Sequence, residues 1–415
     1  MRCRSKAQDG VGLVIAFAAA GHVFLHVLIG LYAVVVLALP ASWGLGYDQL
    51  IALWAWGAAL VGFGAPAAGW LSDRVGPGPM MVVFFLGAGA AAALCGLAAG
   101  PATLQAGLIG LGLFGAIYHP VGLSWVVGAV APDRRGRVLG LVGWFGSVGV
   151  ALVGIVGGGL IWLQGWRLAF MLPGAIAIAI GLLLAGLLWS GRFSAVDKAA
   201  ADEVAATPDS ASAEPALGMA ILVRAGLVLA LTMFACGVLF EALGTVLPKW
   251  YEQTVAADLG GGILGLGALV SATWGIASLS QLAGGLLADR VSPRLVFAVS
   301  FGVKGVALLI ATQVSGLWVP LVGLAVLVAL EVSGPAENML VARYSPRRNR
   351  GLFYGLKYIL GFGAAPVGVA LIAVAYGRFD GHIWLFGVLA LLCAGVCAVA
   401  FLMPSERRQL RANPV

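Results

Sequence analysis

Residues 69–75 read Gly-Trp-Leu-Ser-Asp-Arg-Val, and residues 285–291 read Gly-Leu-Leu-Ala-Asp-Arg-Val. The second copy begins 216 residues after the first. Two further matches occur at an offset of 215: Pro120 with Pro335, and Arg135-Gly136 with Arg350-Gly351. Independent matches at nearly one offset indicate that the chain contains two structurally similar halves.

Composition indicates what these halves are made of. Of 415 residues, 61% are hydrophobic and only 10% are charged, and the mean hydropathy is +1.02. An ordinary soluble domain has roughly 25% charged residues, so a water-soluble core cannot hide this much apolar surface. Long unbroken apolar runs also argue against a transmembrane β-barrel, whose strands alternate polar and apolar residues. The composition predicts an all-α polytopic membrane protein, because a helix satisfies its backbone hydrogen bonds within one segment.

Twelve segments approach or exceed the roughly 20 apolar residues that a membrane span needs. The predicted spans are 11–39, 49–71, 80–99, 104–130, 139–163, 168–190, 219–247, 263–288, 295–314, 317–343, 351–376 and 383–403. They predict an N-terminal six-helix bundle over residues 1–190 and a C-terminal six-helix bundle over residues 219–403. The polar stretch 191–218 is interpreted as a flexible cytoplasmic linker, and residues 404–415 as a cytoplasmic tail.

Basic residues predict the orientation of the spans. With the N-terminus inside, 19 of the 24 Lys and Arg residues lie on the inner side, and only Arg167, Lys249 and Arg378 lie on outer loops. Positively charged loops stay on the cytoplasmic side. We therefore expect both termini to be cytoplasmic, in a multi-pass protein of the bacterial inner membrane. The net charge of +7 then reflects topology, and no nucleic-acid partner is expected.

The repeated Asp-Arg loop resembles the signature of the major facilitator superfamily, and the resemblance covers almost the whole chain. It implies two six-helix bundles with a central cavity between the halves. It also implies that Asp73, Arg74, Asp289 and Arg290 latch the gate, since a carboxylate can bond helix N-termini and an arginine. The alternative is a solvated loop charge. The chain departs from the family pattern after Gly76, where Pro-Gly-Pro stands in place of basic residues.

Ionisable residues inside spans are candidates for function because they are costly there. In this superfamily the first, fourth, seventh and tenth spans line the cavity, and here they carry His22, His26, His119, Glu241 and Glu331. His22 and His26 share one helix face, and Glu241 follows His26 by the repeat offset of 215. The functional hypothesis is that these groups bind protons or substrate; the alternative is hydrogen-bonded packing.

Other predicted site residues accompany these groups. Tyr118 and Trp144 are predicted aromatic cavity residues, and Asn338 shares a helix face with Glu331. Glu337 and Lys357 lie at similar depth, which predicts a buried ion pair with a structural or gating role. Lys304 requires a partner that the sequence does not name. A histidine–carboxylate group could instead bind a transition metal, but nothing in the sequence shows that these side chains converge, so no metal site is predicted.

A shorter resemblance concerns the branch within the superfamily. The stretch Ala116-Ile-Tyr-His-Pro-Val-Gly122, together with His22 and His26, is similar to fosmidomycin-resistance-like transporters and to magnetosome-associated members implicated in iron handling. This resemblance implies proton-driven export, with His22, His26, His119 and Pro120 as the branch's polar groups. The sequence motif of multidrug antiporters in the fifth span is incomplete, since Val150 stands where that motif has proline.

The leading hypothesis is a secondary active transporter that works by alternating access and exports a small organic compound in exchange for protons. One alternative is transport of a metal ion, metal complex or anion. Another is a non-transporting assembly factor or receptor on the same fold. We expect no enzymatic activity, no cofactor beyond the proton gradient, and a monomer in the lipid bilayer. A P-loop sequence is absent, so direct use of ATP is not expected.

Overall fold

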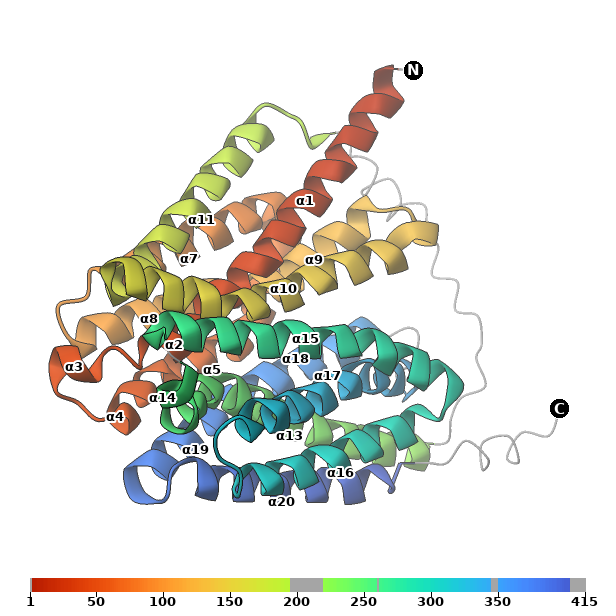
Figure 1. Cartoon of the computed structure of the whole chain (residues 1–415). Helices are drawn as coiled ribbons and strands as arrows, with labels where there is room; N and C mark the ends of the chain where they lie inside the picture. The colour runs from red at the N-terminus through yellow and green to blue at the C-terminus, as the bar shows by residue number, and fades with distance from the viewer. Residues whose placement is uncertain (1, 195–218, 260, 345–349, 404–415) are drawn as a thin grey trace. The chain divides into compact units, whose positions relative to one another are not determined.

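The computed structural model describes residues 2–194, 219–259, 261–344 and 350–403. Within these ranges every regular element is a helix, as predicted (Figure 1). The helices of the first half are α1 (Arg2–Gly30), α2 (Tyr32–Val35), α3 (Pro40–Trp43), α4 (Tyr47–Ile51), α5 (Ala55–Phe63), α6 (Ala65–Val75), α7 (Pro77–Gly96), α8 (Pro101–Gly115), α9 (Tyr118–Ala129), α10 (Pro132–Gln164) and α11 (Trp166–Trp189).

The second half repeats this pattern of long helices. It contains α13 (Met219–Thr254), α14 (Ala256–Leu259), α15 (Gly262–Arg290), α16 (Pro293–Ala311), α17 (Trp318–Tyr344), α18 (Arg350–Gly363), α19 (Ala365–Arg378) and α20 (His382–Ala400). Among the described residues, eleven helical segments are long and apolar enough to cross a membrane. Residues 47–75 form a twelfth if the bent pair is counted as one span. The twelve predicted spans are therefore confirmed as helices.

Prolines explain where these spans break. The axis bends by 46° between Phe63 and Ala65, immediately before Pro66. The fourth span divides into α8 and α9 just ahead of Pro120, and the eleventh divides into α18 and α19 just ahead of Pro366. Proline has no N–H to bond the carbonyl four residues earlier, and its ring clashes with that carbonyl. Each break therefore lies two to four residues before its proline.

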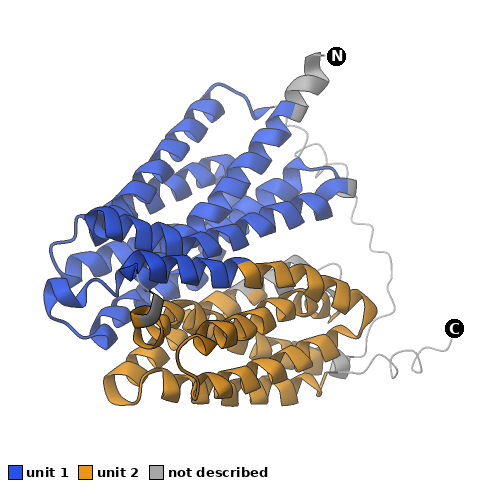
Figure 2. Ribbon diagram, in the orientation of Figure 1, with its two compact units in different colours: residues 1–210, 259–275 blue, residues 211–258, 276–415 orange. Residues whose placement is uncertain are grey.

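The chain divides into two compact units, shown in Figure 2. Unit 1 contains residues 1–210 and 259–275, and unit 2 contains residues 211–258 and 276–415. The first turns of α15 thus group with the N-terminal helices. Residues 195–218 of the predicted linker and the whole predicted tail lie outside the described residues, so the predicted domain boundaries remain a prediction. The central cavity between the halves also remains a prediction.

Within each unit the helices pack in equivalent pairs. In unit 1, α7 packs on α11 and on α8, while α1 packs on α10 and α9. In unit 2 the counterparts are α16 on α20 and on α17, and α13 on α18, α19 and α17. Helices that correspond by sequence offset therefore pack against corresponding neighbours. The internal repeat read from the sequence is a repeat of tertiary packing.

Close backbone approach accompanies the glycines of α10. A Cβ atom added at Gly154 would overlap the carbonyl oxygen of Gly267, and one added at Gly158 would lie 2.5 Å from the Ile263 oxygen. Both contacts join α10 to the part of α15 that belongs to unit 1. Small residues let helix backbones touch in a membrane protein, where packing rather than water drives association. The glycines of α10 thus permit close packing against α15.

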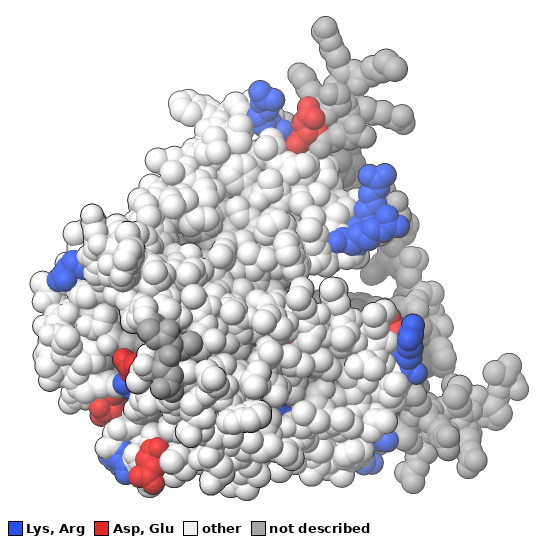
Figure 3. Space-filling view, viewed as in Figure 1, with Lys and Arg blue, Asp and Glu red and all other residues white. Residues whose placement is uncertain are grey.

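Apolar side chains cover the lateral surface. Leu182, Leu231, Leu282 and Leu391 are each more than half exposed. On the face shown in Figure 3, uncharged side chains cover most of the surface and charged ones are few. An uncharged surface of this size suits a lipid environment. The chain is a multi-pass helical membrane protein.

Candidate functional site

The first candidate site lies in unit 1, where α1 meets α9. His22 and His26 are one turn apart on α1, midway along the candidate membrane span Asp9–Val35. At 1.5 Å per residue, His22 lies about 20 Å from either end of that span. The break before Pro120 starts α9 at Tyr118, which places His119 in its first turn. Two sequence motifs far apart in the chain thus present imidazoles at the same level.

Three imidazole rings converge at this level. Ring centroids are 5.1 Å apart for His22 and His26, 5.4 Å for His22 and His119, and 5.8 Å for His26 and His119. One nitrogen from each ring can be chosen so that all three nitrogens lie within 4.8 Å of one another. Within the described part of the chain, this His22–His26–His119 group, called here the histidine triad, has the spacing of a metal site.

Surrounding groups hold the His22 ring in place. Its Nδ1 lies 2.7 Å from the Val142 carbonyl oxygen of α10, and since a carbonyl only accepts, Nδ1 carries the proton. Tyr118 stacks on the same ring with centroids 4.8 Å apart, and its hydroxyl donates to the Ala18 carbonyl at 2.7 Å. Gly146 leaves room for the ring, because an added Cβ would lie 2.5 Å from its Nε2.

The two predicted aromatic residues have different positions. Tyr118 is fully buried and forms one wall of the histidine triad. Trp144 is half exposed and contacts Phe145. It lies two residues from both Val142 and Gly146, so it points to the opposite side of α10 from the face that meets His22. Its predicted role in a substrate cavity remains a prediction.

The second candidate site lies in unit 2 and contains the other predicted ionisable residues. The Lys357 Nζ lies 2.6 Å from the Glu337 Oε2 and donates to the Asn338 Oδ1, also at 2.6 Å. The predicted ion pair between Glu337 and Lys357 is therefore present, with Glu337 buried and Lys357 partly buried. It joins α17 to α18, and Asn338 extends it by one residue along α17. Its role in gating remains a prediction.

Lys304 completes this group, called here the charged cluster. The side chain is fully buried, and its Nζ makes no hydrogen bond with another described residue. The ammonium lies 3.7 Å from the Phe301 ring centroid and within electrostatic range of Glu337 and Glu331. Glu331 accepts a hydrogen bond from the Gln281 side chain of α15. Lys304 thus lies near both acids of α17 and near the thiols of Cys236 and Cys393, without a hydrogen bond to any of them.

Glu241 is a further predicted site residue of unit 2. It is half-buried on α13, and the Thr245 hydroxyl donates to its Oε1 at 3.2 Å within the same helix. A Cβ added at Gly368 of α19 would lie 3.1 Å from the Glu241 Cβ, so this carboxylate stands where α19 approaches closely. His26 and Glu241 correspond by sequence offset, but they belong to different units.

The predicted gate residues are exposed. Arg74 donates to the Trp70 carbonyl at 3.0 Å and stacks 3.5 Å above the Trp70 ring. Asp73, Asp289 and Arg290 make no hydrogen bond or ion pair with another described residue. Among the described residues, the latch contacts that the superfamily resemblance implies are thus not formed. The gating role remains a prediction.

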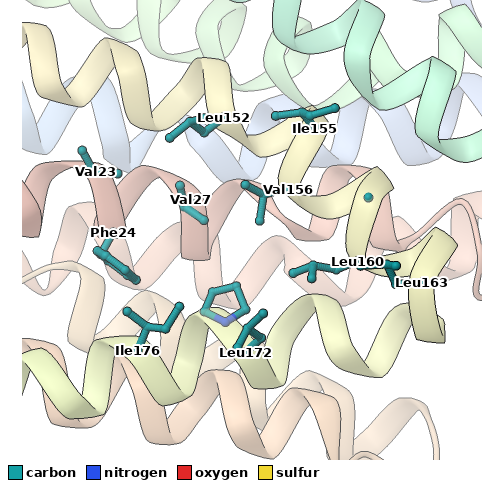
Figure 4. A pocket seen from close by; sticks show the side chains of 12 residues that line it. Val23, Phe24, Val27, Leu152, Ile155, Val156, Leu160, Leu163, Leu172 and Ile176 are labelled. Carbon is teal, nitrogen blue, oxygen red and sulfur yellow. The ribbon is translucent and has the colours of Figure 1, made fainter.

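A groove of about 460 Å³ lies among α1, α10 and α11 (Figure 4). Val23, Phe24 and Val27 line it from α1, next to the helix face that carries the histidines. All twelve lining residues are apolar or glycine, so the groove has no polar side chain to orient a hydrophilic ligand. It is not a candidate for the substrate site.

Sequence reasoning missed several groups that build these sites. The Val142 carbonyl and Gly146 had no signal beyond a glycine-rich start of the fifth span. Gln281 is a neutral residue in an apolar span, which is itself unusual enough to have marked it. Convergence of the three histidines depends on how α1, α9 and α10 pack. That packing cannot be read from the spacing within one helix.

The repeated halves and their apolar helices define a polytopic helical membrane protein. The family model described as the Major Facilitator Superfamily matches residues 17–277 and 250–415. The chain belongs to this superfamily. The resemblance to its fosmidomycin-resistance-like branch is not confirmed.

Curated relatives are similar over part of the chain. An uncharacterized MFS-type transporter of Mycobacterium tuberculosis is 32% identical over 147 residues, which cover 35% of this chain and 25% of that protein. A putative niacin/nicotinamide transporter of Bacillus subtilis is 28% identical over 170 residues, covering 40% of this chain and 41% of the relative. The chain thus spans well under half of the length of these relatives.

Solved structures match over almost the whole chain. A bacterial homolog of the human lysosomal transporter Spinster, in an inward-facing and unoccupied conformation, superposes with a TM-score of 0.71 at 15% identity and covers 98% of this chain and 99% of that chain. A D-xylose–proton symporter superposes with a TM-score of 0.70 at 15% identity, over 92% and 96% of the two chains. At this identity, the likeness concerns the fold alone.

Proposed function

We propose that the chain is a secondary active transporter that works by alternating access and exports a small organic compound in exchange for protons. Membership of the superfamily and similarity to named transporters support the transport activity. The excess of Lys and Arg on one side supports cytoplasmic termini in a bacterial inner membrane. The Tyr118-His119-Pro120 motif supports the fosmidomycin-resistance-like branch, and a monomer is the proposed unit.

The charged cluster carries the proposal of proton coupling. Charged side chains inside a membrane span are costly, so they persist mainly where they pair or serve function. Glu337 is already paired with Lys357, whereas Glu331 is hydrogen-bonded to the neutral amide of Gln281. A proton can therefore bind to Glu331 without breaking the Glu337–Lys357 pair. We assign Glu331 as the group that gains and loses the coupled proton, with Lys304 as its nearby buried cation.

The test has two stages. A growth screen in a host that lacks its own exporters identifies a compound to which the wild-type chain confers resistance. Purified protein in proteoliposomes is then given a pH gradient, and movement of that compound is measured. We expect Glu331→Gln to abolish gradient-driven flux while exchange without a gradient persists.

The matched control is Glu252→Gln, which alters a carboxylate at the end of α13 outside the charged cluster. It should retain gradient-driven flux. Wild-type flux in Glu331→Gln, with the same response to the gradient, would disprove the coupling role of Glu331. A screen without any resistance phenotype would argue for a receptor or assembly role instead.

A second candidate function is transport of a metal ion, which the histidine triad favours over an organic substrate. A metal-sensitivity phenotype in the same screen, without a resistance phenotype, would support it. Loss of that phenotype in His119→Ala should follow, because this histidine brings the only triad imidazole from α9.

A further inference from the structure

The histidine triad has the stereochemistry of a transition-metal site. Its three chosen nitrogens lie within 4.8 Å of one another, on side chains that each have two rotatable bonds. Zinc binds imidazole at about 2.0–2.1 Å in tetrahedral geometry, which sets the nitrogens about 3.3 Å apart. Closing the triad on an ion thus requires side-chain movements of about 1 Å. We propose that His22, His26 and His119 together bind one divalent transition-metal ion of the Zn²⁺ type.

The contact with Val142 prepares His22 for this role. Because its Nδ1–H donates to the Val142 carbonyl, the neutral ring keeps its lone pair on Nε2. Histidine ligands usually donate their second ring nitrogen to a carbonyl or carboxylate, which fixes the tautomer and the ring orientation. Stacking on buried Tyr118 restricts the ring further. The His26 ring makes no hydrogen bond with another described residue, so metal binding would give it a partner.

The donor set selects the class of metal. Three neutral nitrogens suit Zn²⁺, Co²⁺, Ni²⁺ and Cu²⁺, whereas Mg²⁺ and Ca²⁺ require oxygen ligands. Tetrahedral binding by three imidazoles leaves a fourth position open to water or another ligand. The mid-span depth of His22 places the bound ion near the middle of unit 1 along the span.

Comparison of the two halves shows that the fold itself does not need the triad. At the offset of 215, the counterparts of His22, His26 and His119 are Gly237, Glu241 and Gly334. Gly146, which faces His22, corresponds to Gly361. In unit 2 the backbones of Gly237 and Gly361 touch directly, at the place where unit 1 seats an imidazole ring on a glycine. The equivalent helix crossing therefore forms by direct backbone contact in unit 2 and with an imidazole ring between the helices in unit 1.

Metal binding by the purified full-length chain tests this inference without any transport assay. Metal-free protein in detergent is titrated with Co²⁺, whose visible absorption reports four-coordinate binding, and then with Zn²⁺ as competitor. We expect about one ion per chain, displaced by Zn²⁺ and not by Mg²⁺. His26→Ala and His119→Ala should each weaken binding by more than about 100-fold, because loss of an outer hydrogen-bonding partner alone costs 10–100-fold.

The matched control is His382→Ala, which removes the one histidine of this chain outside the triad. It should bind Co²⁺ as the wild type does. Gly146→Ala supplies a variant that keeps all four histidines, since its Cβ would displace the His22 ring, and it should weaken binding. Gly143→Ala lies on the same helix with open space around it and should not.

Two results would overturn the inference. One is a wild-type chain that binds no Co²⁺ or Zn²⁺ above the level of His26→Ala. The other is a His26→Ala or His119→Ala variant that binds with wild-type stoichiometry and affinity. A monodisperse gel-filtration peak for each variant establishes that it is folded. His26→Gln, which keeps the side chain polar and of similar volume, replaces His26→Ala if that variant aggregates.

Discussion

At the scale of single residues, the spans contain few charged side chains, and those of unit 2 lie close to one another. Lys357 binds Glu337 and Asn338, and Lys304 is buried within reach of Glu337 and Glu331. Moving an ion out of water costs several kcal/mol, and only a well-placed opposite charge offsets that cost. Loss of one member of such a pair is therefore worse than loss of both.

We therefore expect a measurable energetic coupling between Glu337 and Lys357. Lys357→Met should lower the free energy of unfolding by about 3 kcal/mol, because it leaves a buried carboxylate without its ion-pair partner. The double variant Glu337→Gln with Lys357→Met should recover more than half of that loss. Urea or thermal unfolding in detergent, compared as a double-mutant cycle, measures the coupling.

Lys249→Met is the matched control, because Lys249 pairs with Glu252 at 2.5 Å near the end of α13, and the Glu252 side chain is 34% exposed against 8% for Glu337. Partly exposed pairs contribute about 0–1 kcal/mol, so a small effect is expected. Equal losses in Lys249→Met and Lys357→Met, with additive behaviour in the cycle, would contradict the claim that burial makes the second pair important.

At the scale of helices, prolines decide where spans break and glycines decide where they touch. The break before Pro120 sets His119 opposite α1, and the glycines of α10 accommodate the His22 ring. A similar contact joins α5 to α8, where a Cβ added at Gly112 would overlap the Gly57 backbone. The overlapped atoms belong to backbone and cannot rotate away.

We therefore expect Gly112→Ala to lower the free energy of unfolding by about 1–3 kcal/mol, the usual cost of overpacking. Gly186→Ala is the control, since an added Cβ there meets nothing within 4 Å. It should be neutral or stabilising, because alanine forms helix better than glycine by up to about 1 kcal/mol. Thermal unfolding of both variants in the same detergent is the measurement. Equal unfolding temperatures would refute the close contact of α5 and α8.

At the scale of the whole molecule, the chain is two copies of one packing pattern. Equivalent helices choose equivalent neighbours in each unit, but the two units carry different chemistry. The histidine triad occupies unit 1, whereas Glu241, Glu331, Glu337, the buried Lys304 and the partly buried Lys357 occupy unit 2. A duplicated scaffold can therefore support two distinct sites. The exposed Asp-Arg loops remain the predicted elements that control how the units move.

If Asp73 forms a latch in one state of the transport cycle, Asp73→Asn should shift the balance between states by a factor of about five or more. Spin labels placed on α6 and α15 near the two Asp-Arg loops would report this shift as a change in the populations of two distances. Asp48→Asn removes an acid in the first turn of α4 and serves as the control. Unchanged populations in Asp73→Asn would exclude the latch.

The sequence by itself determined the class of fold, the number and approximate bounds of the spans, and the internal repeat. These depend on apolar length and on residue spacing within one segment, which are local properties of a chain in lipid. It also predicted the Glu337–Lys357 pair. Two opposite charges at similar depth in neighbouring spans lower their cost in the membrane by pairing. The depth of a charge follows from counting residues.

Only the tertiary structure decided which polar groups meet across helices. The convergence of His22, His26 and His119 requires the break before Pro120, the close approach of α1 to α10 and the room beside Gly146. The partners of Lys304 and Glu331 depend on the rotation of α15, α16 and α17 about their axes. Small residues and side-chain packing fix that rotation in a membrane protein, and hydropathy carries almost no information about it.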